Sequence, residues 1–401
     1  MYLGTKLPSF RDAHEALDVL LRTKLSLKRV ERITERIGGE RVAQREAEIA
    51  AWLRRPLVEK LAAPAGVKPP PVAAVLADGG RLQLRDAAPD AASHWHEYKG
   101  GVLHSLASDV SEHDPCPQVP EVFLQRERID KLAREITSVA ARPESLPTDV
   151  SSAAIGEIGA VSLISPEELP ATGYQPPQVI DRDVVSSRRD SRTFGCHLAA
   201  RAWSLGFFGA GRKAWIGDGQ NGLWTEWERH FKPYGFVPVL DFIHALTHVY
   251  AAAMADRSVT EGWTVYVRWI RCVWQGQVAP VIAELAARQQ ELGLPTPDDG
   301  DTSPRTLVSK TLTYLQNQQS RMNYSEYRRQ GLPITSAHME STIKLLNRRV
   351  KGSEKYWSEA GAEALLQLAA DFLSASQPMT EFWRNRPHRQ RGYRSYAKHV
   401  I

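Results

Sequence analysis

Two aspartates near the middle of the chain follow short apolar runs, in a pattern that suits ligand binding. Residues 213–216 form the first run, which stops shortly before Asp218, and residues 236–240 form the second, which stops at Asp241. Both runs have about the length of a buried strand, and the stretch between them carries apolar side chains at four-residue steps, as one face of a short helix does. Residues 213–250 therefore predict a strand, helix, strand, helix unit with an acid at the end of each strand.

A carboxylate at the end of a buried strand lies where open α/β sheets bind their ligands. Keeping Asp218 charged there is costly unless the group is paired, hydrated or bound to a metal ion. The following Gly219 leaves room for a ligand to approach closely. The alternative is that Asp218 only caps the next helix.

Asp78 is a third acid at the end of an apolar run, which begins at Val72. We expect a hairpin turn at Gly79 and Gly80, an alternating strand after it, and a third strand over residues 97–105. Because Asp-Gly is a favoured turn pair, the local pattern alone makes Asp78 a turn residue.

Glu340 lies near the start of a helix predicted over residues 336–350. An acid in this position usually complements the helix dipole. Here the same helix region carries a basic array, which favours a metal and phosphate role for Glu340. The array consists of Lys344, Arg348, Arg349 and Lys351.

The start of the chain predicts a small helical domain over residues 1–62, followed by a Pro-rich linker at 63–71. Its helices are expected at 9–24, 26–37 and 40–54, with Gly-Gly between the last two. These helices could form a helix-turn-helix that binds DNA phosphates, and the alternative is a small bundle with a solvated basic face. The candidate DNA-binding side chains are Lys28, Arg29 and Arg32.

For the rest of the chain, the sequence pattern predicts an α/β core that is interrupted by two insertions. The expected segments are the first part of the core at 72–107, an irregular Pro-rich insertion at 108–178, the second part of the core at 179–256, a helical insertion at 257–325, the end of the core at 326–380, and a basic tail at 381–401. The tail is either a clamp on a DNA backbone or a solvated end.

Composition indicates a globular protein in a reducing compartment. The chain has 401 residues, of which 42% are hydrophobic, and 51 Lys and Arg against 46 Asp and Glu give a formal net charge of +5. Three widely spaced cysteines argue against a zinc finger or a disulfide scaffold. The first residues lack the apolar run of a signal peptide, and no apolar stretch is long enough to span a membrane. We therefore expect a cytoplasmic protein without a membrane partner.

Three sequence blocks resemble DDE transposases of bacterial insertion sequences, especially the ISKra type, and more distantly Mutator-type transposases. The blocks are ADGGRLQLRD, then GDGQNGLWTEWERHF followed by VLDFIHA, and finally MNYSEYRRQGLPITSAHMEST followed by RRVKGSEKYWS. The similarity runs from roughly residue 10 to residue 385. It implies an RNase H-like α/β core interrupted by a helical insertion.

The resemblance implies a catalytic triad of Asp78, Asp218 and Glu340. These acids would hold two Mg²⁺ or Mn²⁺ ions, which activate water for strand nicking and then the freed 3′-hydroxyl for strand transfer. Oxygen ligands suit such hard cations. The implied partners are the DNA ends of the insertion sequence and target DNA, bound by a homodimer or larger assembly at the bacterial nucleoid.

Two other functions stay open. One is an inactive or repurposed transposase-derived protein that binds DNA, which is favoured by Thr335-Ser336-Ala337 standing where these enzymes usually have Gly-Ser-Gly. The other is an RNase H-like nuclease that nicks without joining.

Asp241 and His244 form a D-x-x-H pair where Mutator-like enzymes have C-x-x-H. We expect this pair to shape the site or position DNA, and Asp241 is the alternative to Asp218 as second catalytic acid. His244 and His248 also have the four-residue spacing of zinc ligands. Because the segment lacks the Glu of an HExxH motif, a structural or DNA-contact role is favoured over zinc.

Overall fold

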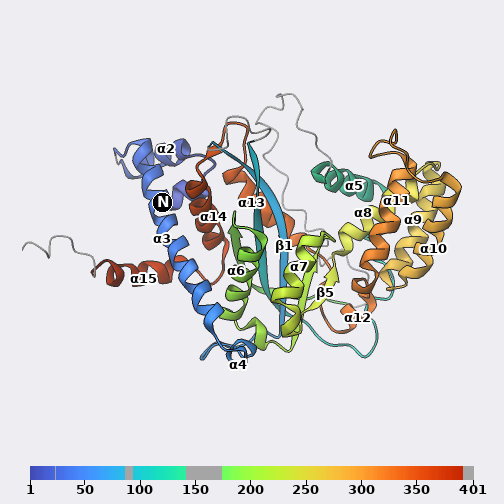
Figure 1. The fold of residues 1–401 in the computed structure, drawn as a ribbon, viewed down its shortest axis with the longest axis horizontal. Helices are drawn as coiled ribbons and strands as arrows, with labels where there is room; N and C mark the ends of the chain where they lie inside the picture. Colours follow the sequence, from blue (N-terminus) through green and yellow to red (C-terminus); the bar gives the residue numbers. More distant parts are fainter. Residues whose placement is uncertain (23, 86–93, 141–173, 392–401) are drawn as a thin grey trace, which may run out of the picture.

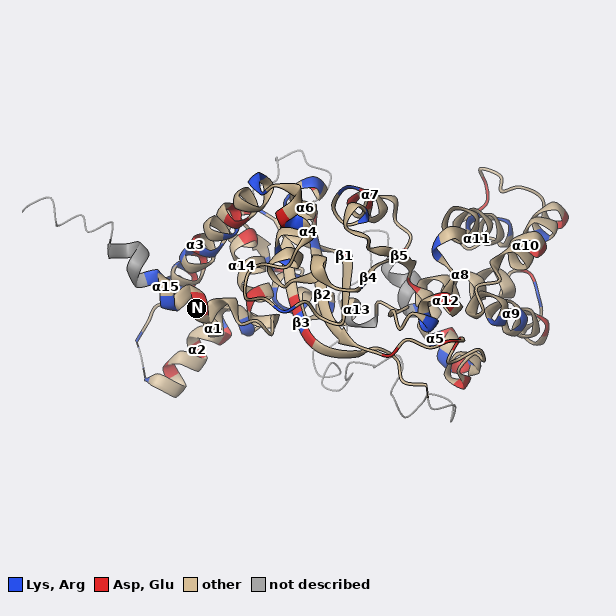
Figure 2. Ribbon diagram, turned by 90° about the horizontal axis from the view of Figure 1, so that it is seen from below, with Lys and Arg blue, Asp and Glu red and all other residues tan. Residues whose placement is uncertain are grey.

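A mixed β-sheet forms the centre of the molecule, with helices on both sides (Figure 1). The computed structural model describes residues 1–22, 24–85, 94–140 and 174–391. The N-terminal helices and the helices of residues 259–318 lie at opposite ends of the long axis (Figures 1 and 2). The predicted α/β class is confirmed. None of the described helices is both long and apolar enough to cross a membrane.

The sheet has the strand order β3-β2-β1-β4-β5, and β6 pairs with the far end of β1. β2 is antiparallel to both of its neighbours, β1 and β3, whereas β4 and β5 continue the sheet in parallel with β1. The strands are β1 (Val72–Leu84), β2 (Trp95–Ala107), β3 (Gln178–Ser187), β4 (Arg212–Gly217), β5 (Val237–Leu240) and β6 (Tyr356–Trp357).

β1 is one strand of 13 residues that runs straight through Asp78, Gly79 and Gly80. The predicted hairpin turn at this point is therefore wrong. A Cβ on Gly80 would lie 2.3 Å from Cζ of Tyr98 on β2, so this glycine makes room for a neighbouring ring instead of bending the chain. The predicted third strand is β2, and residues 86–93 between the two strands lie outside the described part.

The N-terminal helices also differ from the prediction. They are α1 (Tyr2–Lys6), α2 (Phe10–Leu21), α3 (Leu27–Arg54) and α4 (Leu57–Leu61). The two helices expected over 26–37 and 40–54 form the single helix α3, which continues through Gly38 and Gly39, so the predicted helix-turn-helix break there is wrong. A Cβ on Gly38 would lie 2.6 Å from the carbonyl oxygen of Ala364. Close packing between helices therefore accounts for this glycine.

α3 packs against α14 (Glu359–Leu373) through buried charged groups. Arg41 donates from Nε and Nη2 to the two carboxylate oxygens of Asp371, at 2.8 and 3.1 Å. One turn further along, Arg45 Nη1 lies 2.8 Å from Glu363 Oε1. These contacts bind the first part of the chain firmly to the helix that covers β3.

Helices alternate with the strands in the second part of the core. α6 (Ser191–Ser204) follows β3, α7 (Asn221–His230) follows β4, and α8 (Phe242–Met254) follows β5. α13 (Ala337–Val350) packs on β1 and β2. Before β6 the chain also forms η1 (Glu121–Leu124), α5 (Arg126–Ala140) and α12 (Tyr324–Arg329), and the last element of the described residues is α15 (Pro378–Arg391).

Residues 257–325, all of which the structure describes, form only helices and the loops between them, and we call them the helical segment. The elements are α9 (Val259–Trp274), α10 (Val278–Leu292), α11 (Pro304–Gln318) and η5 (Gln319–Arg321), and α12 begins at its end. The cluster packs on α8, through α9 and α11, and so extends the molecule beyond the β5 edge of the sheet (Figure 1).

Candidate functional site

The sheet brings Asp78 and Asp218 to matching positions on neighbouring parallel strands. β1 and β4 pair in register as far as Leu76 and Ile216, and each aspartate follows two residues later. Asp78 lies inside β1, where it pairs with Gly100 of β2, and Asp218 comes directly after β4. Both side chains are partly exposed. The two acids therefore share one edge of the core.

The start of α13 lies against the same place. A Cβ on Gly100 would be 2.8 Å from Ile343 Cδ1 and 3.1 Å from Met339 Cε. Since Gly100 is the partner of Asp78, and Met339 precedes Glu340, the main chain of Glu340 runs beside the Asp78 position. The side chain of Glu340 lies outside the described residues.

Asp241 connects three elements around this site. Its carboxylate is fully buried, and Oδ1 accepts a hydrogen bond of 2.7 Å from the backbone N–H of Ser336, which precedes α13. Oδ2 accepts from the backbone N–H of His244 at 3.2 Å and lies 2.5 Å from its Nδ1. With both oxygens engaged by protein groups, Asp241 is placed to organise the site, and this placement favours the site-shaping role over its alternative as second acid.

The helical segment holds the turn that carries Asp218. Gly219 has a φ of +104°, which favours glycine, and a Cβ there would lie 2.5 Å from Cε2 of Tyr314 on α11. Tyr314 donates its hydroxyl to the backbone oxygen of Asp218 at 2.7 Å, and Gln318 donates to the backbone oxygen of Gly219 at 3.1 Å. Nothing in the local sequence signalled Tyr314 or Gln318 as residues of this site.

The surroundings of Asp218 raise the pKa of its carboxyl group. Loss of contact with water is the main cause, and the nearby Asp241 carboxylate adds to it, while His244 and the N–H of Gln220 act in the opposite direction. A carboxylate in such a place gains from a bound cation, because the cation compensates the lost hydration.

His248 stacks on Tyr314, with ring centroids 3.9 Å apart. Burial lowers the pKa of His248 to about 4, so the ring is uncharged near neutral pH. This packing fits the structural role that the sequence favoured over zinc ligation.

The described carboxylates of the candidate site suit a hard divalent cation. Asp78 and Asp218 offer carboxylate oxygens at one edge, which are the ligands that Mg²⁺ and Mn²⁺ prefer. Among the described side chains, no three His, Cys, Asp or Glu residues come together as a metal-holding group. That set does not include the Glu340 carboxylate, so the predicted triad stays a prediction.

One predicted DNA-binding residue is buried. Arg349 is 3% exposed and donates to the backbone oxygens of Gly4 at 2.9 Å and Pro8 at 3.4 Å. Its guanidinium also lies over the rings of Phe10 and Trp357, at 4.5 and 4.9 Å from their centroids. The prediction that Arg349 contacts DNA is therefore wrong, because this side chain joins the N-terminal helices to α13.

The other predicted DNA-binding side chains are exposed. They lie in two groups, one on α3 and one on or directly after α13, and consist of Lys28, Arg29, Arg32, Lys344, Arg348 and Lys351. Lys28 also pairs with Glu31 at 2.9 Å on the same helix face. Exposure makes all six available to a ligand without showing that one binds.

Comparison of the chain with protein-family models, with curated proteins and with solved structures gave no match.

Proposed function

We propose that the chain has an RNase H-like core and is a DDE-type DNA transposase of the insertion-sequence kind. Three antiparallel strands followed by two parallel ones, in the order β3-β2-β1-β4-β5, support the fold. In an RNase H-like sheet the first acid lies on the first strand, the second ends a later parallel strand, and the third lies on a helix that returns to the site. Asp78, Asp218 and Glu340 follow this arrangement along the chain.

The observation that carries the proposal is the convergence of these three positions. β1 and β4 pair in register up to Leu76 and Ile216, two residues before Asp78 and Asp218, and Met339 of α13, the residue before Glu340, packs at Gly100, the partner of Asp78. In the sequence the three acids are separated by more than a hundred residues at each step. Ordinary turn or cap roles would not require the backbone positions of the three acids to lie at one edge of the sheet.

Asp78, Asp218 and Glu340 would hold the Mg²⁺ or Mn²⁺ ions, which supply Lewis-acid activation of the attacking and leaving oxygens when bound. The chain's own contribution is to fix the acids in place. Tyr314 holds the backbone at Asp218, and Asp241 holds the backbone that leads into α13. DNA is the proposed partner, and bringing two DNA ends together favours a homodimer or larger assembly.

Metal-dependent nicking tests the proposal. Purified protein is incubated with DNA that flanks its coding sequence, in Mg²⁺ and in Mn²⁺, beside Asp218→Asn, Asp78→Asn and Glu340→Gln. The matched control is Asp298→Asn, which removes an exposed carboxylate of the helical segment. We expect the wild type and the control to nick specific ends and the other three variants to lose nicking.

The products decide between the remaining functions. Joined strands identify a transposase, and nicked ends that are never joined identify a nuclease. End-specific binding by the wild type without nicking in either metal would overturn the enzymatic proposal in favour of a DNA-binding derivative.

A further inference from the structure

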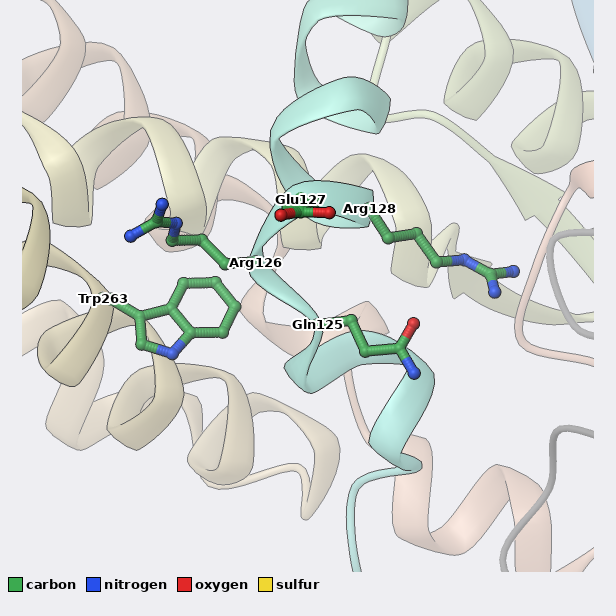
Figure 3. A pocket seen from close by; sticks show the side chains of 5 residues that line it. All are labelled: Gln125, Arg126, Glu127, Arg128 and Trp263. Carbon is green, nitrogen blue, oxygen red and sulfur yellow. The ribbon is translucent and has the colours of Figure 1, made fainter.

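A groove runs along the outer face of α9 and reaches the start of α5. It consists of two adjoining hollows of about 570 and 640 Å³, which share Trp263. The first lies between Trp263 and residues 125–128, where Arg126 lies beside the Trp263 ring and Arg128 points away from it (Figure 3). The second follows α9 as far as Gln275. We call this surface the α9 groove.

The polar side chains of α9 and its C-cap residue that line the groove form one stripe. Thr264, Arg268, Arg271 and Gln275 are spaced by four, three and four residues, and all are exposed. The opposite face of the helix is buried, as at Trp269 and Ile270. α9 thus uses one face for the core and presents a cationic face to solvent.

The charges in the groove are mainly positive. Arg126 and Arg271 form no ion pair with a described residue, whereas Arg268 is paired with Glu284 of α10. Glu127 is the acid that lines the first hollow. Arg126 lines the first hollow, Arg271 lines the second, and Trp263 lines both. This arrangement matches a ligand that carries spaced negative charges.

Trp263 is half-buried, and its ring is supported from behind. The ring centroid lies 4.9 Å from that of Tyr266, with an angle of 31° between the planes. Tyr266 is in turn fixed by a hydrogen bond from its hydroxyl to the backbone oxygen of Phe123, at 3.0 Å. A rigidly backed indole in a basic groove is the combination on which unpaired nucleic acid bases stack.

We propose that the α9 groove binds single-stranded DNA, with a base stacked on Trp263 and phosphates held by Arg126 and Arg271. The choice of DNA rests on the proposed function. A single strand is favoured over a duplex because only an unpaired base offers its face to the indole. The groove would hold a strand outside the candidate site.

The position of the groove fits such a role. Trp274 contacts Phe242, at 5.0 Å between ring centroids, and Phe242 directly follows Asp241. The Gln275 end of the groove therefore lies near the start of α8, beside the candidate site. From there α9 extends about 17 Å to Thr264, at 1.5 Å per residue. A strand in the groove would lead away from the acids.

Binding to a labelled single-stranded oligonucleotide tests the proposal, measured by fluorescence anisotropy over a range of salt concentrations. All variants are made in the Asp218→Asn protein and measured without divalent metal, so the outcome is independent of nicking. We expect Trp263→Leu to weaken binding about five- to 150-fold. Arg271→Gln should weaken binding and reduce the slope of log affinity against log salt by about 0.7.

Three further variants make the result specific. Arg305→Gln removes an exposed arginine of α11, outside the groove, and should leave affinity within about twofold. Glu127→Gln removes the acid and should tighten binding. Trp263→Phe keeps an aromatic ring and should retain more affinity than Trp263→Leu, which separates loss of stacking from loss of folding.

The proposal is overturned if Trp263→Leu and Arg271→Gln bind the single strand as the Arg305→Gln protein does. It is also overturned if these variants lose affinity for a duplex and keep it for the single strand. Failure of nicking with an intact groove effect would instead count against the enzymatic proposal alone.

Discussion

The buried carboxylate of Asp241 accepts a hydrogen bond of 2.7 Å from the backbone N–H of Ser336, which lies 95 residues later in the chain. Ser336 occupies the N-cap position of α13, but its side chain makes no capping bond there. The entry to the Glu340 helix is therefore fixed by a side chain at the end of β5. The geometry of the candidate site depends on this tertiary contact.

Replacing Asp241 should destabilise the fold. Asp241→Ala leaves the N–H of Ser336 and the imidazole of His244 without their acceptor, and we expect a loss of about 2 to 4 kcal/mol in the free energy of unfolding. Asp241→Asn keeps one acceptor oxygen and should lose less. Urea unfolding measures both, with Asp298→Ala as the exposed control. Equal stability of Asp241→Ala and the control would contradict the role assigned to Asp241.

Gly219 and Gly222 form a matched pair for alanine substitution. Gly219→Ala meets both a φ of +104° and the Tyr314 ring, so we expect a loss of about 1 to 3 kcal/mol. A Cβ on Gly222, in the first turn of α7, meets no atom within 4 Å. Gly222→Ala should be neutral or stabilising by up to about 1 kcal/mol. Thermal unfolding of both variants checks the prediction, which fails if Gly219→Ala is as stable as Gly222→Ala.

Gly38 and Gly39 test whether α3 is continuous. Gly38→Ala would place a Cβ 2.6 Å from Ala364, and we expect it to cost about 1 to 3 kcal/mol. Gly39→Ala meets open space and should stabilise the protein by about 0.5 to 1 kcal/mol, since alanine favours a helix interior. Chemical denaturation distinguishes the two. If a turn separated two helices here, Gly39→Ala would destabilise the protein instead.

Arg348 and Arg349 are neighbours with opposite surroundings. Arg349→Ala leaves the Gly4 carbonyl without its partner and removes packing against two rings, so we expect a loss of about 2 to 4 kcal/mol. Arg348 is exposed, and Arg348→Ala should change stability by less than about 0.5 kcal/mol. Unfolding measurements on the two variants decide the point. A larger loss of stability for Arg348→Ala would contradict the assignment.

Glu226 should make the folded protein less stable as pH rises. Burial raises the pKa of Glu226 from 4.5 to about 7 and lowers the pKa of the neighbouring His230 to about 4. Between these two pKa values both side chains are neutral, although Glu226 Oε2 and His230 Nε2 lie 3.4 Å apart. A raised pKa favours folding at low pH, and this contribution disappears as pH rises from 4.5 through 7. The full effect is at most about 3 kcal/mol.

Glu226→Gln removes this titration. Relative to the wild type, the variant should become more stable as pH rises from 5 to 8, and His230 is common to both proteins, so its own titration largely cancels in the comparison. Glu228→Gln, at an exposed position of the same helix, should show the same pH dependence as the wild type. A constant difference between Glu226→Gln and the wild type from pH 5 to pH 8 would refute the prediction.

The sequence predicted the parts of the fold that rest on local pattern. The apolar runs ending at Asp218 and Asp241 became β4 and β5, and the helical segment after them is helical. Their periodicity and length sufficed because each element buries one contiguous stretch. The strand β3 escaped prediction, since its first half is exposed and carries alternating charges.

The errors arose at glycines and at an arginine whose partners lie far along the chain. The local sequence predicted a turn at Gly79 and Gly80 and a helix break at Gly38 and Gly39. Glycine is favoured both in turns and where a strand or helix is closely packed, so the residue type alone does not separate the two. At Gly80 and Gly38 only the distant Tyr98 and Ala364 show that close packing is the reason for the glycine. Tyr314 could not be assigned to the site from sequence for the same reason, since it lies 96 residues from Asp218.

The pairing of Arg41 with Asp371 joins residues 330 positions apart, and this separation constrains the order of events during synthesis. At 5 to 20 residues per second, a ribosome needs roughly 17 to 66 seconds to make the chain between them. Until then α3 has no α14 to cover it, and its arginines stay hydrated. The buried contact between α3 and α14 can therefore form only after Asp371 has been synthesised, long after α3 itself.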